Sequence, residues 1–267
     1  MRILTGMKYL FLWGLLAGMA MAPSGDRIRT RFTPPAGAER VDLPEHSFGA
    51  YLRELPLFPA GTAVHTYDGG LKYRQDVHAA VIDISVGDRD LQQCADAVMR
   101  LRAEHLFAEQ RYPEIAFNFT SGFRADFVRW SRGERIKVNG TTCTWVKTGG
   151  PDASHAALLT YLDKVFTYAG TLSLSRELRS ARHLPMEVGD VFIQGGSPGH
   201  AVIVVDLART ADGRNAFLLA QSYMPAQQIH VLKNLAHPEL GAWFIEGADE
   251  HLQTPEWTFD WGDRKRW

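Results

Sequence analysis

The amino-acid sequence predicts an α+β fold in which a mostly antiparallel sheet is packed with two or three helices. Apolar runs of strand character predict the sheet, and the turn signal Thr-Ala-Asp-Gly at residues 210–213 is typical of an antiparallel meander. These runs cover residues 78–86, 189–194, 200–206, 216–223 and 229–232. Apolar residues at three- and four-residue spacing predict two long helices, at about residues 91–110 and 154–168.

Shorter elements complete this prediction. Aromatic-rich pieces at residues 115–119, 122–130 and 135–138, the last leading into Trp145, predict strands, and Asn139-Gly140 predicts a turn after residue 138. A short helix is expected within residues 48–57, ended by Pro56, and another is expected from Ser173 to about Ala181.

The start of the chain has the pattern of an export signal at residues 1–20. Arg2 and Lys8 precede an apolar run, and the small residue Ala20 offers a cleavage site. The apolar run is too short to span a bilayer, so no stable membrane span is expected in the mature chain. We therefore expect a periplasmic or secreted protein; an uncleaved anchor is the alternative.

The length and charge of the chain limit the domain organisation and the kinds of ligand that we expect for residues 21–267. Residues 21–47 are polar and contain several prolines, which predicts an extended lead-in, and residues 48–267 predict a single α+β domain. The formal net charge of -1 provides no basic field for nucleic acid. The histidines show no HExxH or HxH spacing, and Gly195-Gly196 precedes a strand rather than a helix, so neither a metal nor a cofactor is expected.

Residues 189–206 (Gly-Asp-Val-Phe-Ile-Gln-Gly-Gly-Ser-Pro-Gly-His-Ala-Val-Ile-Val-Val-Asp) predict a strand, a glycine-rich turn and a longer strand that begins with His200. If the next turn centres near residue 211, His200 and Gln221 are diagonal neighbours on adjacent strands, within side-chain reach. Asp206 lies about 20 Å further along the strand, so it cannot orient the His200 ring. Gln221 is therefore the expected partner of His200.

Cys94 has three alternative roles. It lies on the apolar face of the first long helix, where a buried apolar role is the simplest. It could instead pair with Cys143, the only other cysteine, in a disulfide that would stabilise by roughly 4 kcal/mol. The third role is a nucleophile, and with Asp88 or Asp90 as the N-cap, Cys94 is expected in the second helical turn, outside the favourable first turn.

The order of these elements resembles that of NlpC/P60 and other papain-like enzymes. A helix carries a cysteine, Gly-Asp-Val opens a strand and Gly-His opens the next. The resemblance implies Cys94 as nucleophile, His200 as base and Gln221 as the group that orients the imidazole. The family's Asp-Cys-Ser-Gly-Phe signature is absent, because Gln93-Cys94-Ala95-Asp96 stands at that place. The alternative for His200 is a strand-end residue that is hydrogen-bonded to the backbone.

A second resemblance covers about residues 30–245. The matching runs are residues 91–104, 117–122, 168–171, 189–206 and 218–227. They resemble a bacterial family known as domain of unknown function 4846. This resemblance implies an exported envelope protein and carries no established substrate or catalytic residue.

Two functions follow as expectations. The first is a cysteine amidase or peptidase that acts on peptidoglycan peptides through Cys94, His200 and Gln221. The second is a non-catalytic envelope protein that binds glycan or peptide with aromatic side chains. Its candidate binding residues are Trp130, Trp145, Tyr168 and Tyr223.

Overall fold

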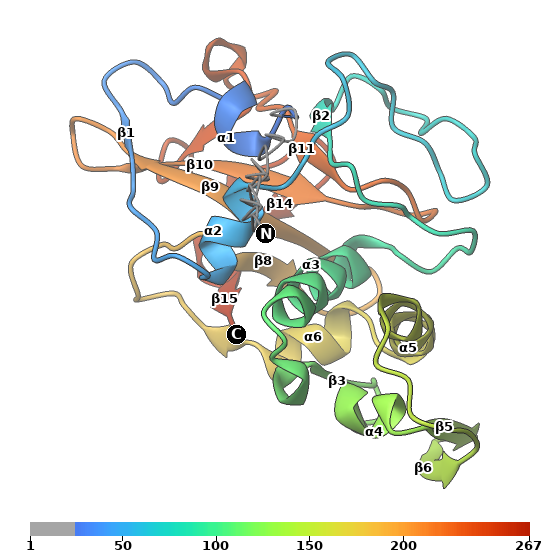
Figure 1. The fold of residues 1–267 in the computed structure, drawn as a ribbon. Helices are drawn as coiled ribbons and strands as arrows, with labels where there is room; N and C mark the ends of the chain where they lie inside the picture. The colour runs from blue at the N-terminus through green and yellow to red at the C-terminus, as the bar shows by residue number, and fades with distance from the viewer. Residues whose placement is uncertain (1–24) are drawn as a thin grey trace, which may run out of the picture.

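The structure, a computed structural model, describes residues 25–267 (Figure 1). The expected export signal at residues 1–20 lies outside the described residues. Across residues 25–267, no helix is both long enough and apolar enough to cross a membrane.

A central antiparallel sheet organises the molecule, as predicted. Its strands follow the order β2 (His78–Val81), β11 (His230–Leu232), β10 (Asn215–Gln221), β9 (His200–Arg209), β8 (Val191–Gln194), β15 (Arg264–Arg266) and β7 (Arg179–Ser180). Two further strands join it, β1 (Glu39–Arg40) beside β9 and β12 (Trp243–Ile245) beside β10. Three small hairpins lie outside it: β3 (Ala116–Asn118) with β4 (Arg124–Asp126), β5 (Glu134–Asn139) with β6 (Thr142–Lys147), and β13 (Leu252–Gln253) with β14 (Thr258–Phe259).

Strands β9 and β10 form the centre of the core because both of their faces are covered. Every residue of β10 is buried, and so is all of β9 except its last residue. Helices α2 (Phe48–Arg53) and α3 (Cys94–Ala108) pack against β9, and Phe217 of β10 packs against the aromatic ring of Trp261. Burial on two faces explains why these strands are almost continuously apolar rather than alternating.

The helical layer lies beside the sheet, where α3, α5 (His155–Tyr168) and α6 (Thr171–Glu177) are neighbours (Figure 1). The prediction for residues 154–168 is confirmed, and Ser154 caps α5 by accepting a hydrogen bond from the backbone N–H of Ala157. A shorter helix, α1 (Ile28–Arg31), packs against α2.

The predicted strand at residues 122–130 is wrong in its second half. Residues 127–131 form helix α4 (Phe127–Ser131), which follows β4 directly. Phe127 and Trp130 stand three residues apart, a helical spacing, and both rings pack against Tyr161 of α5. This tertiary contact favours a helix over the β-propensity of the aromatic residues.

Residues 26–41, expected as an extended lead-in, contribute to the fold. Ile28 is fully buried and its backbone N–H donates to the carbonyl of Leu55, while β1 pairs with β9. The carboxylate of Asp206 on β9 connects this segment to the sheet by accepting a hydrogen bond from Arg40 Nε at 2.7 Å. It also accepts one from Arg53 Nε of α2 at 2.6 Å. Asp206 is fully buried, so both guanidinium groups neutralise a charge that could not otherwise be desolvated.

His105 of α3 yields a prediction about stability. Its ring lies between Phe48 and Tyr51, at 5.4 and 5.6 Å between ring centroids, and neither ring nitrogen has a hydrogen-bond partner among residues 25–267. We expect His105→Phe to leave the free energy of unfolding unchanged or raise it by about 1 kcal/mol at pH 7, because two unpaired buried polar atoms are removed. Urea unfolding measures this change.

The pH dependence and a matched control sharpen this test. Burial lowers the pKa of His105 to about 4, so its contribution to stability is complete above pH 6.5 and is lost as the pH falls towards 4. His105→Phe should remove this part of the acid destabilisation. His230 is equally buried but hydrogen-bonds to the carbonyl of Gln228, so His230→Phe should destabilise. Equal losses for both variants would contradict the prediction.

Candidate active site

Cys94 is the first residue of α3, which corrects the expected second-turn position. The N-cap is Gln93, whose backbone N–H donates to the Asp96 carboxylate at 3.1 Å. Asp90, expected as a cap, instead accepts a hydrogen bond from the backbone N–H of Ala226 at 2.7 Å. The helix therefore begins later than the apolar pattern suggested, and Cys94 stands among the unpaired N–H groups of the first turn.

The Cys94 thiol is largely buried, and its environment favours the neutral form. Burial and then the Asp96 carboxyl raise its pKa to about 11, although hydrogen bonds from the backbone of Ala95 and Ala201 act in the opposite direction. Burial thus outweighs the favourable helix terminus. The disulfide alternative is wrong, because Cys94 and Cys143 are both free.

His200 and Gln221 meet as the strand register predicted. Ala220 opposite Ile203 is the last pair of the β9–β10 ladder, and beyond it His200 Nε2 lies 2.8 Å from Gln221 Oε1. An amide oxygen only accepts, so His200 Nε2 carries the hydrogen and Nδ1 of the neutral ring keeps its lone pair. Burial lowers the pKa of His200 to about 4, so this ring is neutral at pH 7.

The nucleophile and base candidates are neighbours without a direct hydrogen bond. The backbone of Ala201, the residue after His200, is close enough to the Cys94 sulfur to lower the thiol pKa, and residues 25–267 contain no hydrogen bond between that sulfur and the His200 ring. Tyr223 adjoins both groups. Its ring packs edge-on against His200 at 5.0 Å, and its pKa is raised by burial, by Glu256 and by Cys94.

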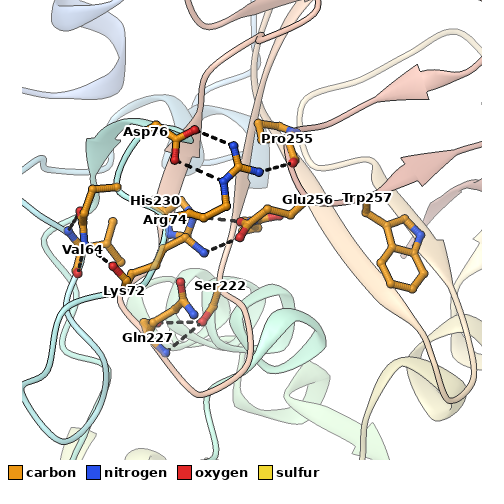
Figure 2. Close-up of polar contacts among 12 residues, drawn as sticks. Val64, Lys72, Arg74, Asp76, Ser222, Gln227, His230, Pro255, Glu256 and Trp257 are labelled. Carbon is orange, nitrogen blue, oxygen red and sulfur yellow. Dashed lines mark hydrogen bonds and ion pairs between the residues drawn. The ribbon is translucent and has the colours of Figure 1, made fainter.

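A buried chain of polar contacts continues behind Gln221 (Figure 2). Gln221 Nε2 donates to Glu256 Oε2 at 2.6 Å, and Lys72 Nζ pairs with Glu256 Oε1 at 2.6 Å. Lys72 also lies over the ring of Tyr223, 5.0 Å from its centroid. Lys72 therefore contacts both Glu256 and Tyr223, the residue whose ring packs against His200.

No local pattern in the sequence indicated Lys72 and Glu256. They are 184 residues apart and stand in irregular segments, so no periodicity or motif connects them. Tyr223 could be placed, because it follows Gln221 by two residues and strand alternation puts both on one face. Trp257, whose ring centroid is 5.5 Å from that of His200, follows Glu256 in the same irregular segment.

A cavity of about 490 Å³ opens beside Cys94. Its lining includes Cys94, Asp96, Thr171 and the glycine-rich turn that precedes His200. Thr171 Oγ1 donates to the carbonyl of Gly196 in this turn, which fixes the turn against α6. The cavity is large enough for a short peptide segment, which would then lie beside Cys94.

The four aromatic residues considered for a binding groove do not line one surface together. Tyr223 lies beside His200. The others pack elsewhere, Trp130 against Tyr161, Trp145 against Phe123 and Tyr168 against Phe119. No group of three or more His, Cys, Asp or Glu residues within residues 25–267 could hold a metal ion.

The sequence model of a family described as Domain of unknown function (4846) matches residues 28–266. The chain belongs to this family. The predicted resemblance is thus confirmed over nearly the whole described chain. No curated protein and no solved structure matches the sequence or the fold of this family member.

The reactivity of Cys94 in this member of the 4846 family is a direct test of the site's electrostatics. A thiol with a pKa of about 11 is ionised to roughly one part in 10⁴ at pH 7, so we expect slow alkylation of Cys94 by iodoacetamide, rising about tenfold per pH unit up to pH 10. Mass spectrometry of the labelled peptides measures this rate. Cys143, half-exposed on the β5–β6 hairpin, is the internal control for reagent access. Rapid, pH-independent labelling of Cys94 between pH 6 and 8 would show a stable thiolate instead.

Proposed function

We propose that this member of the 4846 family is an exported cysteine hydrolase of papain-like type that cleaves amide bonds in cell-wall peptides. The observation that carries the proposal is the placement of Cys94. It is the first residue of α3, its sulfur adjoins the backbone next to His200, and the His200 ring is oriented by Gln221. A nucleophile, a base and an orienting group in this order are what acyl transfer requires.

The reaction begins as the Cys94 sulfur attacks the amide carbonyl and its proton passes to His200 Nδ1. The carbon–nitrogen bond breaks when Nδ1 returns this proton to the leaving amine, which gives a thioester on Cys94 and a free amine. Water then attacks the thioester, with Nδ1 again taking a proton. The thiol and the carboxylic acid are released, so no oxidant or cofactor is consumed.

The N-terminus of α3 stabilises the developing oxyanion. The backbone N–H of Cys94, at the first helical position, has no acceptor in a preceding turn of the helix and can donate to the oxyanion. Donors of this kind contribute about 3 kcal/mol to lowering the barrier in related chemistry. A substrate that fills the cavity beside Cys94 would strengthen this interaction by displacing water from it.

The neutral resting state of both groups determines the course of proton transfer. Since the thiol pKa is raised and the imidazole pKa is lowered, the proton moves during the attack rather than before it. The missing Cys94–His200 hydrogen bond forms when substrate enters, because catalytic hydrogen bonds often tighten only in the substrate complex.

A non-catalytic binding protein is the second candidate. The same two pKa shifts and the absence of a Cys94–His200 hydrogen bond within residues 25–267 favour it. The polar cavity beside Cys94 would then hold a peptide without turnover. Binding that persists in Cys94→Ala and His200→Ala, with no hydrolysis by the wild type, would support this candidate.

Cys94→Ala is the central test of the hydrolase. We expect the purified protein to release new amino groups from peptidoglycan stem peptides, and we expect Cys94→Ala to reduce this rate by at least about 10³-fold. Mass spectrometry of the products and labelling of the amines measure cleavage. Cys143→Ala is the matched control and should retain full activity, since Cys143 lies on the separate β5–β6 hairpin. Undiminished cleavage by Cys94→Ala would remove Cys94 from the mechanism.

The pH profile tests the assignment of His200 as the base. Protonated His200 cannot accept the thiol proton, so kcat/KM should fall as the pH decreases through about 4 and should be flat between about pH 6 and 9. The substrate for this measurement should carry no group that titrates in the range. A loss of activity between pH 7 and 9 would indicate a thiolate–imidazolium pair and contradict the neutral resting state.

A further inference from the structure

We infer that Glu256 is a positioning residue that sets the tautomer of His200 through the Gln221 amide, an inference that rests on the proposed role of His200 as the base. Glu256 does not contact the His200 ring through any hydrogen bond of residues 25–267. It acts one residue further out, on the group that orients the ring.

The direction of the hydrogen bonds follows from what each atom can donate. An ionised carboxylate only accepts, so the Gln221 nitrogen must face Glu256 Oε2, at 2.6 Å. The Gln221 oxygen is thereby turned towards His200 Nε2, at 2.8 Å. Hydrogen on Nε2 leaves the lone pair on Nδ1, the atom that takes the thiol proton in the proposed reaction.

His230 supports the same direction from a third side. Its Nδ1 lies 2.9 Å from the carbonyl oxygen of Gln228, which can only accept, so His230 Nδ1 carries the hydrogen. His230 Nε2 is then an acceptor, and the Gln221 nitrogen lies 3.4 Å from it. Both amide hydrogens of Gln221 therefore have acceptors, whereas a flipped amide would place its oxygen against the Glu256 carboxylate.

Lys72 provides a cationic partner for the second oxygen of Glu256, Oε1. A carboxylate paired with a lysine has only acceptor oxygens, so the direction of its hydrogen bond with the Gln221 amide is fixed. Lys72 Nζ pairs with Glu256 at 2.6 Å, and both side chains are nearly inaccessible to solvent. Arg74 fixes the two segments to each other, since it donates to the carbonyl of Pro255 and pairs with Asp76 (Figure 2).

Glu256→Gln tests this inference by replacing the acceptor-only group with one that can accept or donate. The Gln221 amide can then flip, so we expect the His200 signal to change from the pure Nε2–H form to a mixture with the Nδ1–H form. Nitrogen-15 NMR of histidine-labelled protein distinguishes the two tautomers, with His200→Gln used to assign the signal. In cell-wall peptide hydrolysis, kcat should fall about 10- to 100-fold with little change in KM.

Two further variants keep the test decisive. Lys72→Gln combined with Glu256→Gln avoids an unpaired buried lysine and should give the same mixture if the single variant fails to fold. Glu177→Gln is the matched control, because Glu177 is a partly buried carboxylate that accepts the backbone N–H of Asn118 and should leave the tautomer of His200 unchanged.

The NMR readout separates this inference from the proposed function. An unchanged Nε2–H signal in Glu256→Gln and in the double variant, or an Nδ1–H signal in the wild type, would overturn the role of Glu256 even if Cys94→Ala abolishes hydrolysis. A tautomer shift confined to the Glu256 variants supports this role even if the chain hydrolyses nothing.

Discussion

Strands β9 and β10 pair from Asn215 opposite Arg209 to Ala220 opposite Ile203, with one register shift between Leu218 and Leu219, and the register after this shift determines which side chains meet at the open end of the pair. A slip of one residue would turn every side chain to the other face. His200 and Gln221 would then no longer share a face, and the 2.8 Å contact between them would be lost. At the far end, Asp206 fixes the same strand to α2 and β1 through two buried ion pairs.

Helix α3 brings a second constraint to this end of the sheet. Because the Asp96 carboxylate accepts a hydrogen bond from the backbone N–H of Gln93, the helix begins at Cys94, and the thiol stands at the helix terminus and in the core at once. These two positions have opposite effects on its pKa, and burial wins. The site therefore combines a neutral thiol with a neutral imidazole, and a neutral thiol resists oxidation because the thiolate is the reactive form. In the proposed hydrolase, this combination suits proton transfer during attack.

Much of the fold was predictable because its signals are local. Three local patterns each specify an element within a few residues. They are the helical spacing of apolar residues at 154–168, the Asn139-Gly140 turn and the apolar runs of the central strands. Two local predictions failed for the same reason. The start of α3 and the helix at Phe127–Ser131 depend on partners elsewhere in the chain. Asp90 accepts a hydrogen bond from the backbone N–H of Ala226 instead of capping α3, and the aromatic rings of α4 pack on Tyr161.

By itself, the sequence determined the fold class, the family and the proximity of His200 to Gln221. That proximity was predictable because strand alternation and a short turn determine which residues of two paired strands lie next to each other. Only the tertiary structure decided the position of Cys94 at the first turn and the joining of Lys72 and Glu256 behind Gln221. Those contacts connect residues as much as 184 positions apart, and a buried charge acquires a partner through the packing of whole segments. No local pattern records such a partner.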